Sequence, residues 1–212
     1  MDKEKVIPFE KFTAKYEEWF AKYKFAYWSE LDAVGSLIPS GTGLEVGIGS
    51  GKFAKPLGIE YGIDPSIKML KISKKLDLKV VKAIGENIPF KNKSFDFVLM
   101  ITSICFLNDL KKTISEVKRV LKDKGFIIIG FIDKNSPIGK YYLENKEKSP
   151  FYKVANFYST DELIAILKEL NFSNFSFKQT IFKPYWELKS VDKIEDGYGK
   201  GSFVVIRAQN LT

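Results

Sequence analysis

The chain has 212 residues, 45% of them hydrophobic, with a net charge of +8, one cysteine and no histidine. This composition predicts one globular domain, and it excludes an internal disulfide, a cysteine-rich metal site and any catalytic couple or zinc site that needs imidazole. We expect no resident metal. No apolar run reaches about 18 residues and MDKEKVIPFEKF lacks the apolar core of a signal peptide, so we also expect a cytoplasmic protein without a membrane span.

The positive charge comes almost entirely from lysine, because Arg119 and Arg207 are the two arginines of the chain. The lysines are spread along the sequence, in stretches such as KKLDLK, KNK and KDK. Such a spread is typical of a solvated surface, whereas nucleic-acid binding needs a focused basic face. We therefore predict that nucleic acid is not the partner of this protein.

Apolar and amphipathic segments alternate along the chain. The first 38 residues carry aromatic residues at helical spacing, which favours one or two amphipathic helices. Helices are then expected from about residue 51, at 66–76 and at 109–122. The predicted strands between them are 43–48, 59–63, 79–84, 96–101 and 125–132. This alternation predicts a parallel sheet that helices cover on both faces.

The last part of the chain begins with a long connection. Residues 133–158 are polar, aromatic and irregular, as is typical of a lid or binding loop. Ser159 or Thr160 then caps a helix, and runs 175–182 and 202–207 suit an antiparallel closing hairpin. Within a single domain 1–212 we therefore predict a helical cap (1–40), a cofactor-binding core (41–132), a lid insertion (133–158) and a closing unit (159–212).

The stretch GLEVGIGSGKF, residues 43–53, is a glycine-rich turn that follows an apolar run. Its alternating glycines are Gly47, Gly49 and Gly51. Glycine lets backbone approach a ligand closely, because it has no Cβ and tolerates positive φ. A Walker-type phosphate loop is excluded, since Val46 and Phe53 occupy positions where that motif needs glycine and Ser or Thr.

Two acidic residues narrow the choice of ligand. A dinucleotide fingerprint fits as Gly49, Gly51 and Ala54, so a nicotinamide cofactor stays open. Asp64 ends the next predicted strand and suits a ribose diol under either cofactor. Glu45 precedes the turn; it would repel a pyrophosphate and attract an ammonium or sulfonium group. The electrostatics therefore favour a cationic nucleoside.

Five segments in order resemble class I S-adenosylmethionine-dependent methyltransferases, in particular the small-molecule branch that includes ubiquinone and menaquinone biosynthesis enzymes. They are FTAKYEEWF, LEVGIGSGKFA, YGIDPS, VVKAIGENIPFKNKSFDFVL and ISEVKRVLKDKGFIIIG. The resemblance implies an α/β, Rossmann-like, doubly wound fold. Its sheet would have seven mostly parallel strands, an antiparallel closing hairpin and an N-terminal helical cap. It also implies S-adenosylmethionine as the cofactor.

The resemblance assigns several residues to the methionine part of the cofactor. The backbone would approach it at three glycines, Gly47, Gly49 and Gly51. Glu45 would order that loop and its contacts with the ammonium group, and the Tyr16 hydroxyl would reach the cofactor carboxylate. Ile101 matches the strand-end position whose carbonyl faces the ammonium group. From the residues alone, Tyr16 is equally well read as a core anchor of its helix.

Other residues would hold the nucleoside. By resemblance, Asp64 binds the ribose hydroxyls and Pro65 borders the adenine, while Gly85 and Glu86 line its other face. Glu86 is equally well read as a surface acid. Many relatives have aspartate at position 84 to hold the adenine amino group. This chain has Ile84 there, so backbone groups would have to do so.

We expect the methyl acceptor under the N-terminal helix and the 133–158 insertion. The residues expected to form its walls are Phe106, Tyr141, Tyr142, Tyr152 and Tyr158. Relatives often carry histidine at position 106, so base catalysis from there is in doubt and no catalytic residue is assigned. In-line displacement in a dry pocket relies mainly on positioning and desolvation, and it suits a small N, O or S acceptor.

Two alternatives remain open at this stage. A nucleic-acid methyltransferase would suit the charge, but ITSICFLND lacks the Asn/Asp-Pro-Pro-aromatic motif that holds a flipped base. A nicotinamide oxidoreductase or a non-catalytic nucleotide-binding module could use the same fold. Cys105 follows the fourth predicted strand, where cytosine-C5 enzymes place a nucleophile. Ile104 replaces the proline of their motif, so we interpret Cys105 as a buried thiol.

Overall fold

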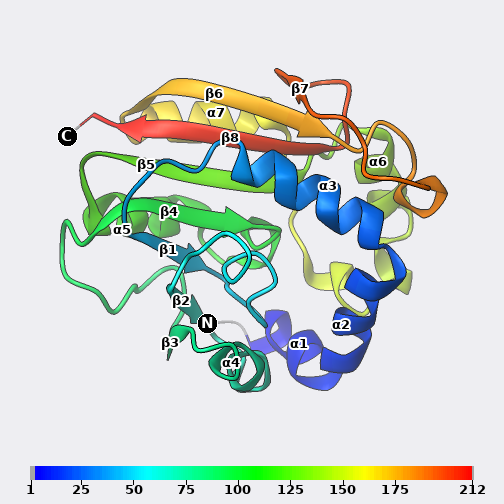
Figure 1. Cartoon of the computed structure of the whole chain (residues 1–212), viewed down its shortest axis with the longest axis horizontal. Helices are drawn as coiled ribbons and strands as arrows, with labels where there is room; N and C mark the ends of the chain where they lie inside the picture. Colours follow the sequence, from blue (N-terminus) through cyan, green and yellow to red (C-terminus); the bar gives the residue numbers. More distant parts are fainter. Residues whose placement is uncertain (1–2, 212) are drawn as a thin grey trace.

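The computed structural model describes residues 3–211, which fold around one mixed sheet (Figure 1). Among these residues the sheet has eight strands in the order β3-β2-β1-β4-β5-β8-β6-β7. The strands are β1 Gly43–Val46, β2 Tyr61–Asp64, β3 Lys79–Lys82, β4 Phe95–Ile101, β5 Leu121–Ile132, β6 Phe172–Thr180, β7 Glu195–Asp196 and β8 Phe203–Asn210. β1 to β5 pair in parallel, whereas β8 runs antiparallel to both β5 and β6. The predicted mostly parallel sheet with an antiparallel end is confirmed.

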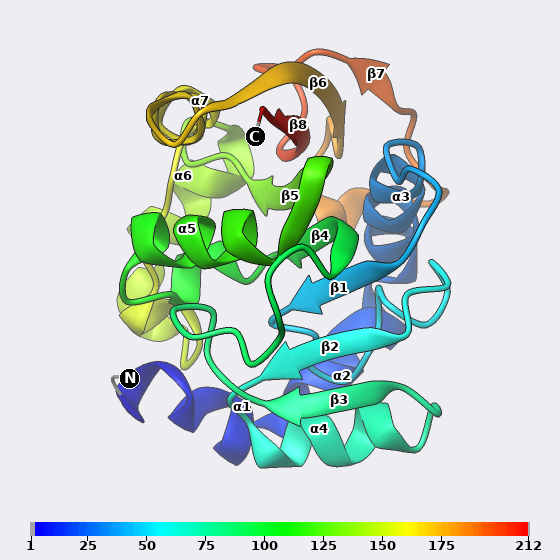
Figure 2. The same cartoon turned by 90° about the vertical axis from the view of Figure 1, so that its left-hand side faces the viewer.

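Helices cover both faces of the sheet. The α-helices within residues 3–211 are α1 Ile7–Lys11, α2 Thr13–Lys22, α3 Lys24–Gly35, α4 Ile67–Lys74, α5 Leu110–Val120, α6 Pro137–Glu144 and α7 Thr160–Glu169. Figure 2 shows α5 and α7 on one side of the sheet and α3 on the other. One buried cluster joins Ile114 of α5 and Leu163 of α7 to the sheet, and a second joins Val34 of α3 to its opposite face. The doubly wound arrangement is therefore confirmed.

Local sequence explains where these elements begin. β4 reads FDFVLMI and is almost entirely buried, as is typical of a central parallel strand. The Asp109 carboxylate caps α5 by accepting the Lys112 N–H, and Ser159 and Glu162 form a reciprocal capping box at α7. The cap predicted at residue 159 is confirmed.

Several predicted elements are wrong in detail. The helix expected from residue 51 does not form; residues 51–58 make turns, because Gly51 and Gly58 adopt positive φ and Pro56 interrupts the segment. The N-terminal segment makes three helices rather than one or two. The two-residue β7 brings the sheet to eight strands instead of seven. Residues 133–158 are not wholly irregular, since Ser136 caps α6 and Pro137 occupies its first turn.

The two ends of the 133–158 insertion lie side by side, between the end of β5 and the start of α7. Asp133 accepts hydrogen bonds from the Thr160 N–H at 2.9 Å and the Thr160 hydroxyl at 2.6 Å, and the Lys134 N–H donates to the Tyr158 carbonyl. Between these ends, α6 lies with α1 and α2 beyond the arrowheads of β1 and β4 (Figure 1). The insertion and the N-terminal helices thus meet at the carboxyl edge of the parallel strands. The division into cap, core, lid and closing unit stays a prediction.

Candidate active site

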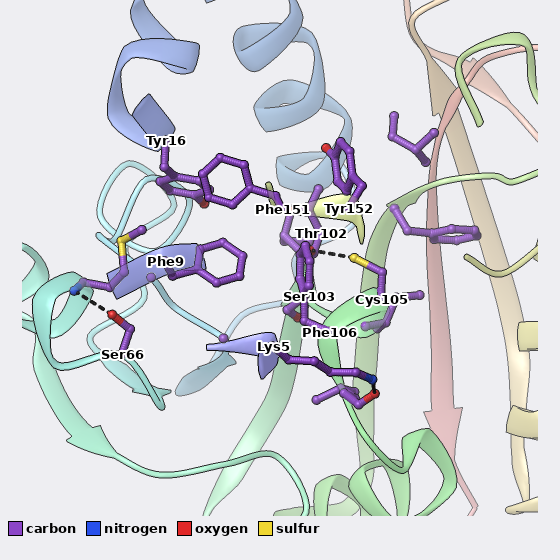
Figure 3. A pocket seen from close by; sticks show the side chains of 18 of the residues that line it. Lys5, Phe9, Tyr16, Ser66, Thr102, Ser103, Cys105, Phe106, Phe151 and Tyr152 are labelled. Atoms are coloured by element: carbon purple, nitrogen blue, oxygen red, sulfur yellow. Dashed lines mark hydrogen bonds between the residues drawn. The ribbon is translucent and has the colours of Figure 1, made fainter. Parts of the chain in front are cut away.

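A cavity of about 620 Å³ lies at that carboxyl edge, between the strand ends, α1 to α3 and the insertion (Figure 3). Eight of the ten predicted cofactor residues line it: Tyr16, Gly47, Gly49, Asp64, Pro65, Gly85, Glu86 and Ile101. So do the five predicted acceptor residues: Phe106, Tyr141, Tyr142, Tyr152 and Tyr158. Glu45 and Gly51 are the two predicted residues that do not reach its wall. The volume suits a ligand of ordinary small-molecule size.

The glycine turn forms one wall with its backbone. Gly47 and Gly49 have φ of +81° and +52°, and the Gly47 N–H donates to the Ile63 carbonyl at 2.8 Å. A Cβ at Gly47 would lie 2.5 Å from the Ser103 Cβ. A side chain is therefore excluded there both by conformation and by space, and main chain faces the cavity.

Two of the predicted residues, Gly51 and Glu45, lie behind this wall and do not line the cavity. A Cβ at Gly51 would meet Leu78 Cδ1 at 2.6 Å, so this glycine serves packing beneath the turn. Glu45 is buried on β1, where the Ala54 N–H donates to its carboxylate. Burial, reinforced by the charge of Asp64, raises the pKa of Glu45 well above its usual value. This position suits the predicted role of Glu45 in ordering the loop, but not direct contact with a ligand.

Asp64 ends β2 and faces the cavity. One carboxylate oxygen accepts the Gly49 N–H at 2.9 Å and the other accepts the Ser66 N–H at 2.8 Å. Burial raises its pKa to about 6, although these two hydrogen bonds favour the charged form. Each carboxylate oxygen has two acceptor positions, so Asp64 can still accept hydrogen bonds from a ligand diol.

Glu86 is not a surface acid, since it is buried and lines the cavity. Its Oε1 accepts the backbone N–H groups of Asn108 at 2.8 Å and Asp109 at 3.2 Å. Glu86 thereby holds the loop that follows β4.

Cys105 belongs to this loop and lines the cavity, and its thiol donates to the Thr102 carbonyl. Burial raises the Cys105 pKa to about 12, so the thiol is unsuited to be a nucleophile.

We call the part of the cavity lined by Gly47, Gly49, Asp64, Pro65, Gly85 and Glu86 the glycine half. The aromatic half is lined by Phe9, Phe106, Tyr142, Phe151, Tyr152 and Tyr185. Figure 3 shows rings from α1, from the loop after β4 and from the insertion directed toward one another. The ring centroids of Phe9 and Phe106 are 4.9 Å apart, and those of Tyr142 and Tyr152 are 4.4 Å apart.

Tyr16 connects the two halves. Its ring lies 5.8 Å from Phe9, and its hydroxyl would lie 3.7 Å from a Cβ at Gly49. Burial, with the neighbouring charges of Glu45 and Asp64, raises the Tyr16 pKa well above its usual value. The hydroxyl therefore stays protonated and able to donate a hydrogen bond. Tyr141 lies at the rim, where it is 45% exposed and contacts Trp186.

Sequence reasoning missed several residues of the wall. Thr102 follows β4 with φ of +48°, an uncommon conformation for a β-branched residue, and Ser103 donates its hydroxyl to the Val46 carbonyl. No sequence signal marks that backbone conformation. Phe9 and Glu30 also line the cavity. Helical spacing in the sequence can assign each of these residues to one face of its helix. It does not reveal which face of the helix meets the strand ends.

Comparisons with known proteins assign the family. Residues 44–129 match the family model of the methyltransferase domain. An uncharacterized protein of Methanocaldococcus jannaschii is 49% identical over 96% of this chain and 98% of its own length. A Thermotoga maritima crystal structure, described as an S-adenosylmethionine-dependent methyltransferase and possible histamine N-methyltransferase, superposes with a TM-score of 0.95. It is 45% identical and covers 97% of this chain and 99% of its own. An Arabidopsis thaliana tRNA (carboxymethyluridine(34)-5-O)-methyltransferase is 29% identical over 59% of this chain and 35% of its own length.

The chain thus belongs to the S-adenosylmethionine-dependent methyltransferases, and it is a transferase that uses S-adenosylmethionine. The glycine half fits this cofactor, because a backbone cradle that a Cβ would fill lies beside the Asp64 carboxylate. The predicted enzyme class and cofactor are confirmed, and the nicotinamide alternative is set aside. Separately, none of the helices within residues 3–211 has the length and apolar character needed to cross a bilayer.

Proposed function

We propose that this enzyme methylates a small organic molecule at a nitrogen, oxygen or sulfur atom, and that the aromatic half binds this acceptor. The observation that carries the proposal is the closely spaced set of rings that continues directly from the glycine half. Pockets for small molecules are concave, mostly apolar and furnished with a few polar groups. The aromatic half has this character, with the tyrosine hydroxyls as its polar groups.

In the glycine half, the position of each residue supports the role that the resemblance implies for it. Asp64 would accept the ribose hydroxyls, while Pro65 and Gly85 would border the adenine on either side. The Tyr16 hydroxyl would donate to the cofactor carboxylate, because it stays protonated and points toward Gly49. Main chain at Gly47 and the end of β4 at Ile101 would line the methionine part.

S-adenosylmethionine supplies an electrophilic methyl group on a positively charged sulfur. The chain's own contribution is to hold an acceptor lone pair in line with that group and to exclude water. Rings such as Phe9, Phe106 and Phe151 exclude water from the reaction space, and aromatic faces also stabilise positive charge. No base is needed when the acceptor already carries a free lone pair, which agrees with the absence of histidine.

A second candidate is methylation of a nucleic acid. Four lysines line the cavity, namely Lys5, Lys15, Lys22 and Lys148. Lys15, Lys22 and Lys148 are exposed and would suit phosphates, whereas Lys5 donates to the Leu107 carbonyl. Against this stands the absence of a flipped-base motif after β4. We therefore propose the small-molecule acceptor first. The ubiquinone and menaquinone branch stays a prediction.

The test compares both acceptor classes directly. Purified enzyme would be incubated with S-adenosylmethionine and either a panel of small amines, phenols and thiols or total tRNA at physiological salt. Mass spectrometry would measure S-adenosylhomocysteine and the methylated product. We expect turnover of a small acceptor and salt-sensitive, unproductive binding of tRNA. Turnover of tRNA with no small acceptor in the panel would contradict the proposal.

A further inference from the structure

One carboxyl group in the cavity wall has no structural task. Glu30 lies on α3, is 4% exposed and lines the cavity. Within the described part of the chain, no hydrogen bond or ion pair involves its carboxyl group, and burial alone raises its pKa to about 8. Buried carboxyl groups are normally paired, because an unpaired one loses its hydration without compensation. The carboxyl group of Glu30 therefore needs a partner that residues 3–211 do not provide.

Its neighbour on the helix shows what a structural polar residue does at this position. The Ser29 hydroxyl donates to the Phe25 carbonyl at 2.6 Å and accepts the Asp192 N–H at 2.8 Å. The first bond lies within α3, and the second ties α3 to a segment near the end of the chain. Glu30 has no such contact, although it is one residue away.

The other carboxyl groups of the wall are also accounted for. Asp64 and Glu86 both accept backbone N–H groups, and Glu18 is exposed on α2. Of the four carboxyl side chains that line the cavity among residues 3–211, Glu30 alone is both buried and without a hydrogen bond. Nor does any ion pair within these residues join Glu30 to one of the four lysines that line the cavity.

The surroundings of Glu30 indicate the charge of the missing partner. The Glu30 carboxyl acts electrostatically on two tyrosine hydroxyls, that of Tyr27 on its own helix and that of Tyr152 in the insertion, and its charge helps to raise the pKa of both. Tyr152 belongs to a cluster of three tyrosines. The ring centroid of Tyr142 lies 4.4 Å from that of Tyr152 and 6.3 Å from that of Tyr185. A carboxylate beside aromatic faces is a favourable setting for an organic cation, which gains an ion pair and cation–π attraction together.

We infer that Glu30 recognises a positively charged nitrogen of the methyl acceptor, so that the enzyme selects a compact organic amine. This inference rests on the proposed function and narrows its substrate class. Glu30 acts as a recognition residue: it pairs with one nitrogen and thereby positions the acceptor in the aromatic half. The chain retains a buried, unpaired carboxyl group because the acceptor completes its pairing.

The test uses probes that differ only in the amino group. Tyramine, phenethylamine and histamine are compared with 4-ethylphenol, ethylbenzene and 4-ethylimidazole by calorimetric titration, with S-adenosylhomocysteine present. The wild type should bind at least one amine on the order of 100-fold more tightly than its counterpart. Glu30→Gln should abolish that preference and leave the affinity for S-adenosylhomocysteine within about twofold, because α3 does not supply the glycine half.

Matched variants separate recognition of the amine from a change in the charge or the stability of α3. Asp32→Asn removes the same charge from an exposed position of the same helix and should change neither affinity. Glu30→Asp keeps the charge and should restore part of the amine preference. The ligand-free Glu30→Gln enzyme should melt at a higher temperature than the wild type at pH 7 to 9, since it no longer holds a buried ionisable group. A structural role for Glu30 would lower that temperature instead.

The outcomes distinguish this inference from the proposed function. Equal binding of every amine and its counterpart, an amine preference that survives Glu30→Gln, or a lowered melting temperature in that variant would overturn the inference. If neutral acceptors are nevertheless methylated, the proposed function stands without it. Methylation of tRNA with no binding of any small probe would overturn both.

Discussion

The two halves of the cavity are built in different ways. The glycine half consists of main chain and of carboxylates that already accept backbone N–H groups, such as Asp64 and Glu86. The aromatic half consists of side chains from segments far apart in sequence, such as Phe9, Phe106 and Phe151. The same cavity is lined by Glu30, whose carboxyl group has no hydrogen bond or ion pair within residues 3–211. The carboxylates of the glycine half are thus held by hydrogen bonds within the chain, whereas the Glu30 carboxyl group is held by none within residues 3–211. This is the difference expected between a shared cofactor and an acceptor that varies among enzymes.

Gly47→Ala should break the glycine half most severely. The new Cβ at position 47 would sit on a residue with unfavourable φ and lie 2.5 Å from the Ser103 Cβ. Gly58 has a similar φ of +71°, but a Cβ there would have no atom within 4 Å. The φ cost alone is about 1–2 kcal/mol. We expect that loss of unfolding free energy for Gly58→Ala, and more than about 3 kcal/mol together with lost cofactor binding for Gly47→Ala. Urea unfolding and calorimetry measure both; equal losses would show that the close approach is unimportant.

Asp64→Ala should weaken cofactor binding by about 10- to 150-fold, because a charged acceptor contributes about 1.5–3 kcal/mol. Glu86→Ala serves as the matched control: it removes a buried carboxylate that holds a loop and should have the smaller effect. Calorimetric titration with S-adenosylhomocysteine measures the affinity of each variant. Unchanged affinity in Asp64→Ala would remove the ribose assignment.

The difference between the halves also explains what the sequence could predict. Spacing within one short segment revealed the glycine turn and the acids at the strand ends, because a strand followed by a tight turn places them in a fixed relation. The aromatic half depends on how α1 to α3 and the insertion fold back over the sheet. Tyr152 could be proposed there, but neither the burial of Glu30 nor the conformation of Thr102 leaves a mark in sequence. The helix expected from residue 51 failed for a local reason, since positive φ at Gly51 and Gly58 turns the chain.

Cofactor binding should depend on pH through Asp64. Its pKa is raised from 3.8 to about 6, mainly by burial and in part by Glu10, so the folded ligand-free enzyme binds a proton that the unfolded chain releases. The bound proton on Asp64 stabilises the folded enzyme. Its contribution to the free energy of unfolding is fully present below about pH 4 and is lost as the pH rises through about 6. A diol needs the ionised form, so affinity should fall about tenfold between pH 7.5 and pH 5. The shift in melting temperature on adding S-adenosylhomocysteine measures it, and Asp64→Asn should show a flat profile.

Phe106→Leu should affect the aromatic half alone. Its ring packs edge-on against Phe9 and stacks with Tyr152, and losing such aromatic contacts costs about 0.5–1.5 kcal/mol. We expect acceptor KM to rise about three- to tenfold, with the affinity for S-adenosylhomocysteine unchanged. Phe175→Leu removes a ring that stacks on Phe177, outside the set of residues that line the cavity, and should leave both constants as they are. If Phe106→Leu weakened binding of S-adenosylhomocysteine as much as it raised KM, the two halves would act as one energetic unit, and the distinction between a preformed cofactor half and an acceptor half would fail.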